Sequence, residues 1–171
     1  MKKTMVILGL GSNVGEKHAN LLQCVSRLRQ FVFPLRCSSI YESQALLPAG
    51  SPPEWNIAFL NMAVAGDTEH SAQELFAIIK SLEHEMGRKD RGIWAPREID
   101  IDILAYGDEV INTHELAIPH KELLNRDFAL LPMAEIAPDW CHTCGLTSEE
   151  LVFQKNYVVD EKLKIAYAPP H

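Results

Sequence analysis

The order of apolar patterns along the chain is the feature that most constrains its fold. Short apolar or alternating runs, which are typical of strands, are interrupted twice by segments whose apolar residues recur every three or four positions, as in an amphipathic helix. The resulting order is strand, helix, strand, strand, helix, strand, which is that of the ferredoxin-like split βαβ motif. The six segments are residues 5–10, 16–32, 36–44, 56–66, 71–86 and 97–106.

Local signals support the second helix and add two further helical segments. Ser71 and Glu74 form a capping box at the start of the second helix, and Gly87 follows its end. Downstream, residues 123–136 have a helical pattern, and a second capping box at Thr147 opens a final helix. We therefore expect an α+β fold, with a ferredoxin-like βαββαβ antiparallel sheet, helices on one face and a C-terminal helical extension.

Composition is typical of a globular protein. The 171 residues are 47% hydrophobic, and we expect a single domain over residues 1–171 that is a monomer. A net charge of −7 argues against a general nucleic-acid or membrane-surface binder, although a local basic patch can still hold a small anion. The N-terminal apolar stretch is too short for a signal peptide, and no run approaches 18 apolar residues. We therefore expect a cytoplasmic protein with four reduced cysteines.

Two of the cysteines, Cys141 and Cys144, form a Cys-x-x-Cys pair near the C-terminus. A closed zinc site needs four ligands, and no second pair exists to complete one. Pro138 and Gly145 flank the pair, whereas a redox Cys-x-x-Cys normally opens a helix after a strand. A turn is the favoured interpretation, and the sequence leaves open whether it ever binds metal.

Two aspartates alternate with isoleucines in the last strand segment. A period of two places Asp100 and Asp102 on one face and Ile99, Ile101 and Ile103 on the other. Aspartate is depleted in strands, so two of them in alternation need a reason. Their Cβ atoms would be roughly 6.5 Å apart, so both carboxylates can reach one or two Mg²⁺ ions, which also take water and substrate phosphates as ligands. The alternative is that both carboxylates are simply solvated on an exposed face.

The loop before this strand is basic in an otherwise acidic chain. Its formal charge over residues 88–97 is +3, because it holds four cations and one acid. Arginine guanidinium groups bind phosphate oxygens well. Cations beside paired carboxylates are therefore consistent with a site in which a polyphosphate and its metal ion lie between the arginines and the aspartates. The alternative is a surface loop that makes ordinary salt bridges. The charged residues are Arg88, Lys89, Asp90, Arg91 and Arg97.

Other candidates for binding are scattered. Trp94, in the basic loop, would either stack on a ligand or anchor the loop. Asn61 lies inside an apolar strand segment, where a buried amide must find partners and is suited to reading the edge of a heterocycle. Each of His120, Arg126 and Phe128, taken singly, is more typical of a structural residue.

Five segments together resemble the 6-hydroxymethyl-7,8-dihydropterin pyrophosphokinase family of folate biosynthesis. They are LGLGSNVGEKHANL, FLNMAV, LEHEMGR, WAPREIDIDIL and IPHKELLNRDF, and the resemblance runs from about Val6 to Pro138. It implies a ferredoxin-like single domain that transfers the β,γ-diphosphate of ATP, the co-substrate, to the pterin hydroxymethyl group and releases AMP. The resemblance also implies two Mg²⁺ ions as the cofactor of this transfer. The small-molecule partners would then be ATP and the pterin, with no nucleic acid or membrane.

The resemblance also implies roles for individual residues. As catalytic residues it implies Arg97, Asp100 and Asp102, of which Asp100 and Asp102 would hold the metal ions. As pterin-binding residues it implies Ser43, Phe59, Asn61 and Phe128. As nucleotide-binding residues it implies Glu83, Lys89, Arg91, Trp94, Arg97, Ile103, His120 and Arg126.

The chain departs from the family pattern beside the proposed site. Ile93 stands where the family usually has arginine, and the loop is about one residue short, which leaves open whether Lys89 or Arg91 contacts phosphate. Gln44 stands where the family usually has proline, which leaves the conformation of the pterin-side loop open. We expect residues 46–55 and 88–96 to close over bound substrates, so that product release can limit turnover.

Two other functions compete with this interpretation. A nucleotidyltransferase would also use paired aspartates and Mg²⁺, but it would release diphosphate rather than AMP. A non-catalytic binding module on the same fold would need basic charge and surface aromatics for nucleic acid, and the acidic chain argues against it.

Overall fold

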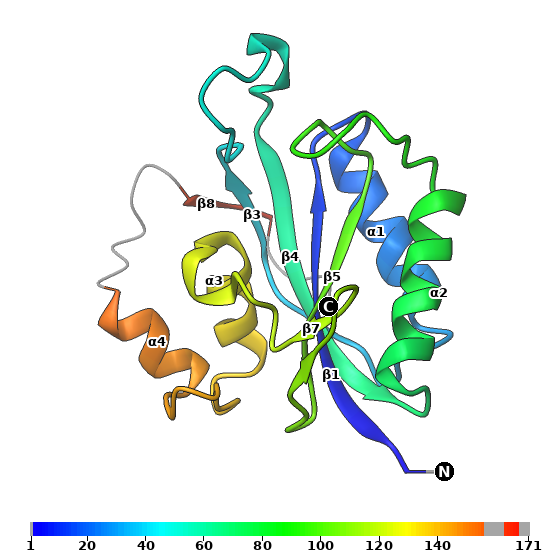
Figure 1. Ribbon diagram of the computed structural model, residues 1–171, viewed down its shortest axis with the longest axis vertical. Helices are drawn as coiled ribbons and strands as arrows, with labels where there is room; N and C mark the ends of the chain where they lie inside the picture. Colours follow the sequence, from blue (N-terminus) through cyan, green and yellow to red (C-terminus); the bar gives the residue numbers. More distant parts are fainter. Residues whose placement is uncertain (1, 156–162, 168–171) are drawn as a thin grey trace.

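The structure, a computed structural model, describes residues 2–155 and the strand β8 (Leu163–Tyr167). The other strands are β1 (Thr4–Ser12), β2 (Arg36–Cys37), β3 (Ile40–Ser43), β4 (Phe59–Thr68), β5 (Asp100–Tyr106), β6 (Ile111–Asn112) and β7 (Ala117–Ile118). In this part of the chain, six strands form a central sheet in the order β5-β1-β4-β3-β8, with β2 paired to β4 (Figure 1). Strands β6 and β7 form a separate small sheet.

The helices divide into two pairs that cover opposite faces of the sheet. They are α1 (Lys17–Leu28), α2 (Ala72–Glu85), α3 (Asp127–Ile136) and α4 (Ser148–Gln154), with short 3₁₀ turns at Pro53–Trp55 and Leu123–Asn125. Helices α1 and α2 lie on one face, and α3 and α4 lie on the other (Figure 1). The expected α+β ferredoxin-like order is thus confirmed, and the C-terminal extension covers the second face.

The central position of β1 follows from its composition. Val6, Ile7 and Leu8 are consecutive and fully buried, because neighbouring side chains point to opposite faces and both faces are covered. The alternation in β5 has the same basis. Ile101 and Ile103 pack under α1 and α2, whereas Leu104 packs with α3 on the other face.

The predicted strand at residues 36–44 is divided in two by serine side chains. The Ser38 hydroxyl accepts the backbone N–H of Ala63, and Ser39 donates through both its N–H and its hydroxyl to Glu135 of α3. The chain therefore leaves the regular ladder between β2 and β3 and is fastened to α3 instead. Such side-chain competition with a strand ladder is not visible in apolar periodicity.

The C-terminal cysteine pair lies in a turn, as expected. Cys141 and Thr147 form an isolated antiparallel β-bridge across the turn. Gly145 has a φ of 88°, the left-handed conformation that glycine adopts readily. Among residues 2–155, no three histidine, cysteine or acidic side chains gather in a way that could hold a metal ion. No helix in that same range has the length and apolar character needed to cross a bilayer.

Candidate active site

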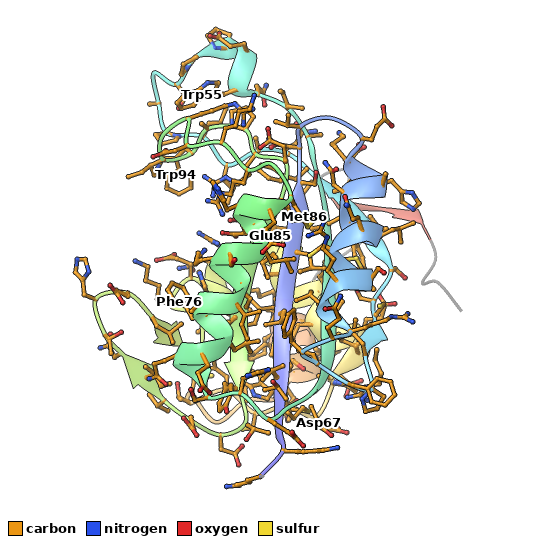
Figure 2. All side chains as sticks on the ribbon, turned by 90° about the vertical axis from the view of Figure 1, so that its right-hand side faces the viewer. Trp55, Asp67, Phe76, Glu85, Met86 and Trp94 are labelled. Atoms are coloured by element: carbon orange, nitrogen blue, oxygen red, sulfur yellow. The ribbon has the colours of Figure 1, made fainter. Side chains whose placement is uncertain are left out.

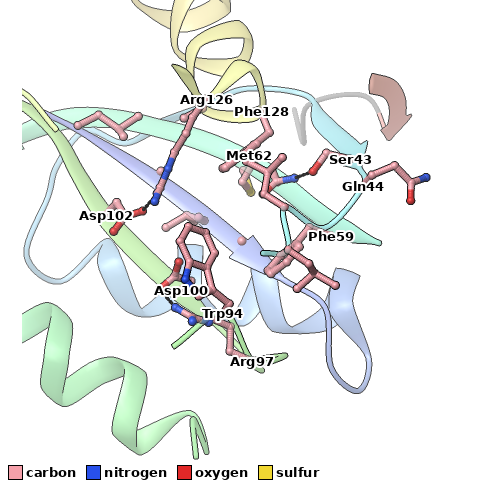
Figure 3. A pocket seen from close by; sticks show the side chains of 18 of the residues that line it. Ser43, Gln44, Phe59, Met62, Trp94, Arg97, Asp100, Asp102, Arg126 and Phe128 are labelled. Carbon is pink, nitrogen blue, oxygen red and sulfur yellow. Dashed lines mark hydrogen bonds and ion pairs between the residues drawn. The ribbon is translucent and has the colours of Figure 1, made fainter. Parts of the chain in front are cut away.

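A pocket of about 220 Å³ opens on the half of the second sheet face that α3 leaves uncovered (Figure 3). The strand residues that line the pocket point to the same face of the sheet as Ile7, Ala63 and Leu104, which pack with α3. Further along the same strands, the face is open and carries the polar side chains of Asn61, Asp100 and Asp102. The lining comprises Gly9, Leu10, Gly11, Ser43, Gln44, Leu46, Leu47, Phe59, Asn61, Met62, Ile93, Trp94, Ala95, Arg97, Asp100, Asp102, Leu104, Arg126, Phe128 and Ala129.

Two glycines of β1 form the floor of this pocket. Gly9 pairs with Asp102 and Gly11 with Asp100 in the β1–β5 ladder, and Gly11 also pairs with Asn61 of β4. A Cβ atom on Gly11 would lie 3.1 Å from the Asn61 side-chain oxygen. The Gly-Leu-Gly-Ser-Asn segment continues β1 to Ser12, two residues beyond the strand segment predicted from the sequence.

Each aspartate of the pair has its own cations. The Asp100 carboxylate accepts from the Arg88 Nη1 at 3.0 Å and the Arg97 Nη1 at 3.2 Å. The Asp102 carboxylate accepts from the Arg126 Nη1 at 3.3 Å, and its other oxygen lies 3.8 Å from the His120 Nε2. Figure 3 shows both carboxylates on one strand facing different guanidinium groups. The side chains of Asp100 and Asp102 retain 26% and 30% exposure, so a ligand in the pocket can reach both.

Burial and charge shift the titration of two groups at this end of the pocket. Desolvation raises the pKa of Asp102 above its ordinary value, and the neighbouring Asp100 charge adds to the rise. Desolvation lowers the pKa of His120 to about 4, with a further contribution from Arg126. His120 Nδ1 accepts the backbone N–H of Glu122, so the neutral ring carries its proton on Nε2, toward Asp102.

The donor set of the Asp pair fits magnesium better than a closed transition-metal site. Two carboxylates project into one pocket, and no third metal-ligating side chain joins them among the described residues. Magnesium is commonly held by one or two carboxylates while water and substrate phosphates fill its remaining positions. Asp100 and Asp102 are therefore the residues that would hold it.

The opposite end of the pocket is apolar with a polar edge. Asn61 is buried and donates to the Ser43 hydroxyl at 2.7 Å, which fixes the orientation of the amide. Phe59, Phe128 and Met62 line the pocket around it. A flat heterocycle with hydrogen-bonding edges suits such a lining.

A second, basic cleft adjoins this pocket. It is about 550 Å³ in volume, and Ala95 and Arg97 line both cavities. The cleft is also lined by Lys80, Glu83, His84, Arg88, Lys89, Asp90, Arg91, Gly92 and Pro96. Together with Arg97, five of the residues that line the cleft are lysine or arginine, which makes the cleft suited to an anion.

Glu83 connects the basic cleft to the Asp pair. This buried carboxylate of α2 accepts the backbone N–H of Ile101 at 2.8 Å, the residue between the two aspartates. It also pairs with Arg88 at 2.6 Å and Lys80 at 3.0 Å. Arg88 therefore bridges Glu83 and Asp100, and α2 is fastened to β5 where the strand enters the pocket.

The loop of residues 88–96 lies between the two cavities. Arg91 forms a bidentate ion pair with Glu98, with N–O distances of 2.6 and 3.0 Å. These hydrogen bonds from Arg91 lower the pKa of Glu98 to about 2. Trp94 lines the pocket with a φ of 69°, which is unusual for a residue with a side chain, and Ile93 is 81% exposed. Figure 2 shows Trp55 and Trp94 at the same end of the molecule, on the two loops expected to close.

The structure brings most of the predicted residues together. Those that line the main pocket are Ser43, Phe59, Asn61, Trp94, Arg97, Asp100, Asp102, Arg126 and Phe128. Glu83, Lys89 and Arg91 line the basic cleft, and His120 lies beside Asp102. Ile103 is the exception, because its side chain is 4% exposed and belongs to the core on the α1–α2 face. A nucleotide contact at Ile103 would have to involve its backbone.

Arg88 was counted in the sequence only among the loop cations, and its bridging position was not predicted. Gly9 and Gly11 were also missed as pocket residues. The signal for the glycines was their alternation inside a buried strand, since glycine there often marks a close approach of another group. The signal for Arg88 was its charge in the basic loop, which could not reveal a partner on α2.

Comparison with known proteins agrees with these features. Residues 7–138 match the family described as 7,8-dihydro-6-hydroxymethylpterin-pyrophosphokinase. A 2-amino-4-hydroxy-6-hydroxymethyldihydropteridine pyrophosphokinase of Aquifex aeolicus is 45% identical over 80% of this chain and 82% of its own length. A protein of the same name from Methylorubrum extorquens is 40% identical over 80% and 84% of the two chains.

Longer relatives contain the same region as one part. A folate synthesis bifunctional protein of Chlamydia muridarum is 40% identical over 78% of this chain, which spans only 30% of that protein. A crystal structure of Plasmodium falciparum HPPK-DHPS with pteroate superposes with a TM-score of 0.71 over 96% of this chain and 44% of that one. At 16% identity, this likeness supports the fold alone. The family match and the two relatives of similar length establish that the chain belongs to the 7,8-dihydro-6-hydroxymethylpterin-pyrophosphokinase family.

Proposed function

We propose that this chain transfers the diphosphate of ATP to the hydroxymethyl group of 6-hydroxymethyl-7,8-dihydropterin and releases AMP, a step of tetrahydrofolate biosynthesis. The observation that carries the proposal is that two different cavities adjoin each other at Ala95 and Arg97. One cavity suits a flat heterocycle and the other suits a polyphosphate. The Asp pair lines the first cavity, and Asp100 pairs with Arg88 and Arg97 of the second. The names of the Aquifex aeolicus and Methylorubrum extorquens relatives describe the same reaction class.

Binding of the pterin would use the apolar end of the pocket. Asn61, held by Ser43, would read the hydrogen-bonding edge of the ring, and Phe59 and Phe128 would contact its faces. The floor of β1 glycines gives the ring room beside the amide. The hydroxymethyl group would then point toward the Asp pair at the other end of the same pocket.

Binding of ATP would use the basic cleft and the arginines around the Asp pair. Three arginines already form ion pairs with the Asp100 and Asp102 carboxylates: Arg88, Arg97 and Arg126. They would bind phosphate oxygens when ATP is bound. Glu83, Lys89, Arg91 and Trp94 line the surrounding cavities, and His120 lies beside Asp102. The backbone of Ile103 is the remaining proposed contact.

Phosphoryl transfer depends mainly on positioning and charge neutralisation. Two Mg²⁺ ions, held by Asp100 and Asp102, would neutralise phosphate charge and polarise the acceptor hydroxyl. Arg97, which lines both cavities, would stabilise negative charge that develops between them. Apart from the two aspartates, the described residues that line the pocket include no carboxylate, imidazole or amine that could accept a proton. The arrangement therefore favours positioning over base catalysis.

We further propose that residues 1–171 act as one domain, as a cytoplasmic monomer whose partners are small molecules. The single central sheet, which both core clusters share, supports one domain for the described residues. All four cysteines are free thiols, which supports a reducing compartment. The acidic net charge supports the absence of a nucleic-acid partner.

Product identification tests the reaction. The protein is supplied with ATP, Mg²⁺ and the hydroxymethyl-dihydropterin, and the products are separated and weighed by mass spectrometry. The proposal expects AMP and a diphosphorylated pterin in equal amounts. Release of diphosphate with a nucleotidylated pterin would identify a nucleotidyltransferase instead, and pterin binding without turnover would indicate a binding module.

A further inference from the structure

The cations of the basic cleft differ in how far their charge is already paired. Lys80 and Arg88 pair with Glu83, Arg97 pairs with Asp100, and Arg91 pairs with Glu98. The Lys89 side chain is exposed and has no carboxylate oxygen within 4.0 Å among the described residues. The cleft therefore offers one unpaired ammonium, on the same loop as Arg91.

Glu98 accepts hydrogen bonds from two residues in the first half of that loop, Lys89 and Arg91. Its two oxygens accept both terminal nitrogens of Arg91, and the backbone N–H of Lys89 lies 3.4 Å from one of them. The same guanidinium also donates to the Pro96 carbonyl at 3.3 Å. Arg91 thus ties the start of the loop to its end, and Glu98 ties both to the entry of β5.

The position of Glu98 makes this attachment firm. Its backbone carbonyl accepts the side chain of Asn20 on α1, and the next residue, Ile99, is fully buried. At the end of the loop, the Arg97 N–H donates to the Asn13 side chain at 2.8 Å. The carboxylate is therefore fixed to the core, whereas the loop that it holds is mostly exposed.

We propose that Glu98 is a positioning residue that fastens the loop of residues 88–96 through Arg91, and that Lys89 rather than Arg91 is the cation that this loop presents to ATP phosphates. This assignment rests on the proposed function. A guanidinium that already makes a two-pronged pair has few donors left for a second anion, whereas the Lys89 ammonium keeps all three. Glu98 thereby sets which cation of the loop meets the substrate.

The experiment compares Glu98→Gln, Arg91→Met, their double variant and Lys89→Met with the wild type. Glu85→Gln is the control, because Glu85 also pairs with an arginine on the surface, through one contact between α2 and Arg27 of α1 at 3.1 Å. Two quantities are measured on the full chain. Hydrogen exchange of residues 88–96 is followed without ligand, and the affinity for a non-hydrolysable ATP analogue is measured with Mg²⁺.

If Glu98 positions the loop through Arg91, Glu98→Gln and Arg91→Met should each speed hydrogen exchange of residues 88–96 about threefold, as expected for loss of one well-formed surface ion pair. The double variant should be no faster than either single variant, because both remove the same interaction. The analogue should bind about tenfold more weakly to Lys89→Met, and only a few times more weakly to Glu98→Gln and Arg91→Met.

Two results would overturn the inference. One is unchanged loop exchange in Glu98→Gln and Arg91→Met. The other is an ATP-analogue affinity that rises in Glu98→Gln, or that falls far more in Arg91→Met than in Lys89→Met, since either would make Arg91 the phosphate ligand. Absence of AMP in the wild-type reaction would refute the proposed function instead. The hydrogen-exchange data would still test whether Glu98 positions the loop of residues 88–96.

Discussion

Glu83 provides the sharpest test of how the site is held together. Glu83 is 3% exposed, and its carboxylate accepts hydrogen bonds from the Ile101 backbone and Lys80 and forms an ion pair with Arg88. Glu83→Ala would leave the Ile101 N–H without an acceptor inside the core and remove one of the two carboxylates that hold Arg88. Glu83→Gln would keep an acceptor for Ile101 and remove only the charge.

The magnitude follows from these partners. A buried N–H left without an acceptor costs about 1–3 kcal/mol, and breaking a buried charge pair by removing one partner costs about 3–5 kcal/mol. The two costs overlap, so we expect Glu83→Ala to lower the free energy of unfolding by about 3–5 kcal/mol. Glu83→Gln should lose about 1–2 kcal/mol, because the Ile101 bond survives and Arg88 keeps Asp100.

Urea denaturation followed by circular dichroism measures these differences through the transition midpoint at constant slope. For a chain of this length, the Glu83→Ala melting temperature should fall by roughly 6–20 °C. Glu85→Gln, which breaks an exposed pair on the same helix, should stay within about 0.5 kcal/mol of the wild type. A Glu83→Ala variant within about 1 kcal/mol of the wild type would refute the view that this carboxylate fastens α2 to β5.

Three further predictions concern acid stability and the pterin pocket. The folded His120 has its pKa lowered to about 4, so the unfolded chain binds a proton first as pH falls below about 6.5, and stability present above that pH is lost progressively toward pH 4. His120→Asn should therefore be less acid-sensitive than the wild type by roughly 2 kcal/mol at pH 5 in urea titrations, and equal sensitivity would show that His120 is not buried in its neutral form. Phe128→Ala should weaken pterin binding about tenfold or more in calorimetry with the ATP analogue present, while leaving nucleotide affinity nearly unchanged; a larger loss for the nucleotide would move Phe128 to the other site. Gly11→Ala, whose Cβ would lie 3.1 Å from the Asn61 oxygen, should also lower pterin affinity more than nucleotide affinity, and equal losses would mean that the strand itself had shifted.

The alternation in β5 allowed both the fold and the metal-binding candidates to be predicted. A period of two must separate Asp100 and Asp102 from Ile101 and Ile103, whatever lies on either side of the sheet. The structure confirms this separation, with the isoleucines under α1 and α2 and the aspartates in the pocket. Local patterns of this kind are reliable because they depend only on strand geometry.

Partners distant in sequence were harder to predict. The hydrogen bond from Ile101 to Glu83, the bridge through Arg88 and the break between β2 and β3 all depend on how α2 and α3 dock on the sheet. The alternation of Gly9 and Gly11 in a buried strand was a signal for a close approach, but the partner of Gly11, Asn61, is known only from the pairing of β1 with β4. Periodicity gives the direction of a side chain, whereas these contacts require the register between elements.

The most direct test of the central claim is AMP formation by Asp102→Asn. The substitution keeps the shape of the side chain and removes a charge next to Asp100, so the folded state should be retained, with a free energy of unfolding within about 1 kcal/mol of the wild type. If Asp102 holds Mg²⁺ for diphosphate transfer, AMP release from ATP and the hydroxymethyl-dihydropterin should fall below about a tenth of the wild-type rate, with the loss in kcat. A folded Asp102→Asn variant that releases AMP at more than that rate would contradict the assignment of the Asp pair as the catalytic metal site.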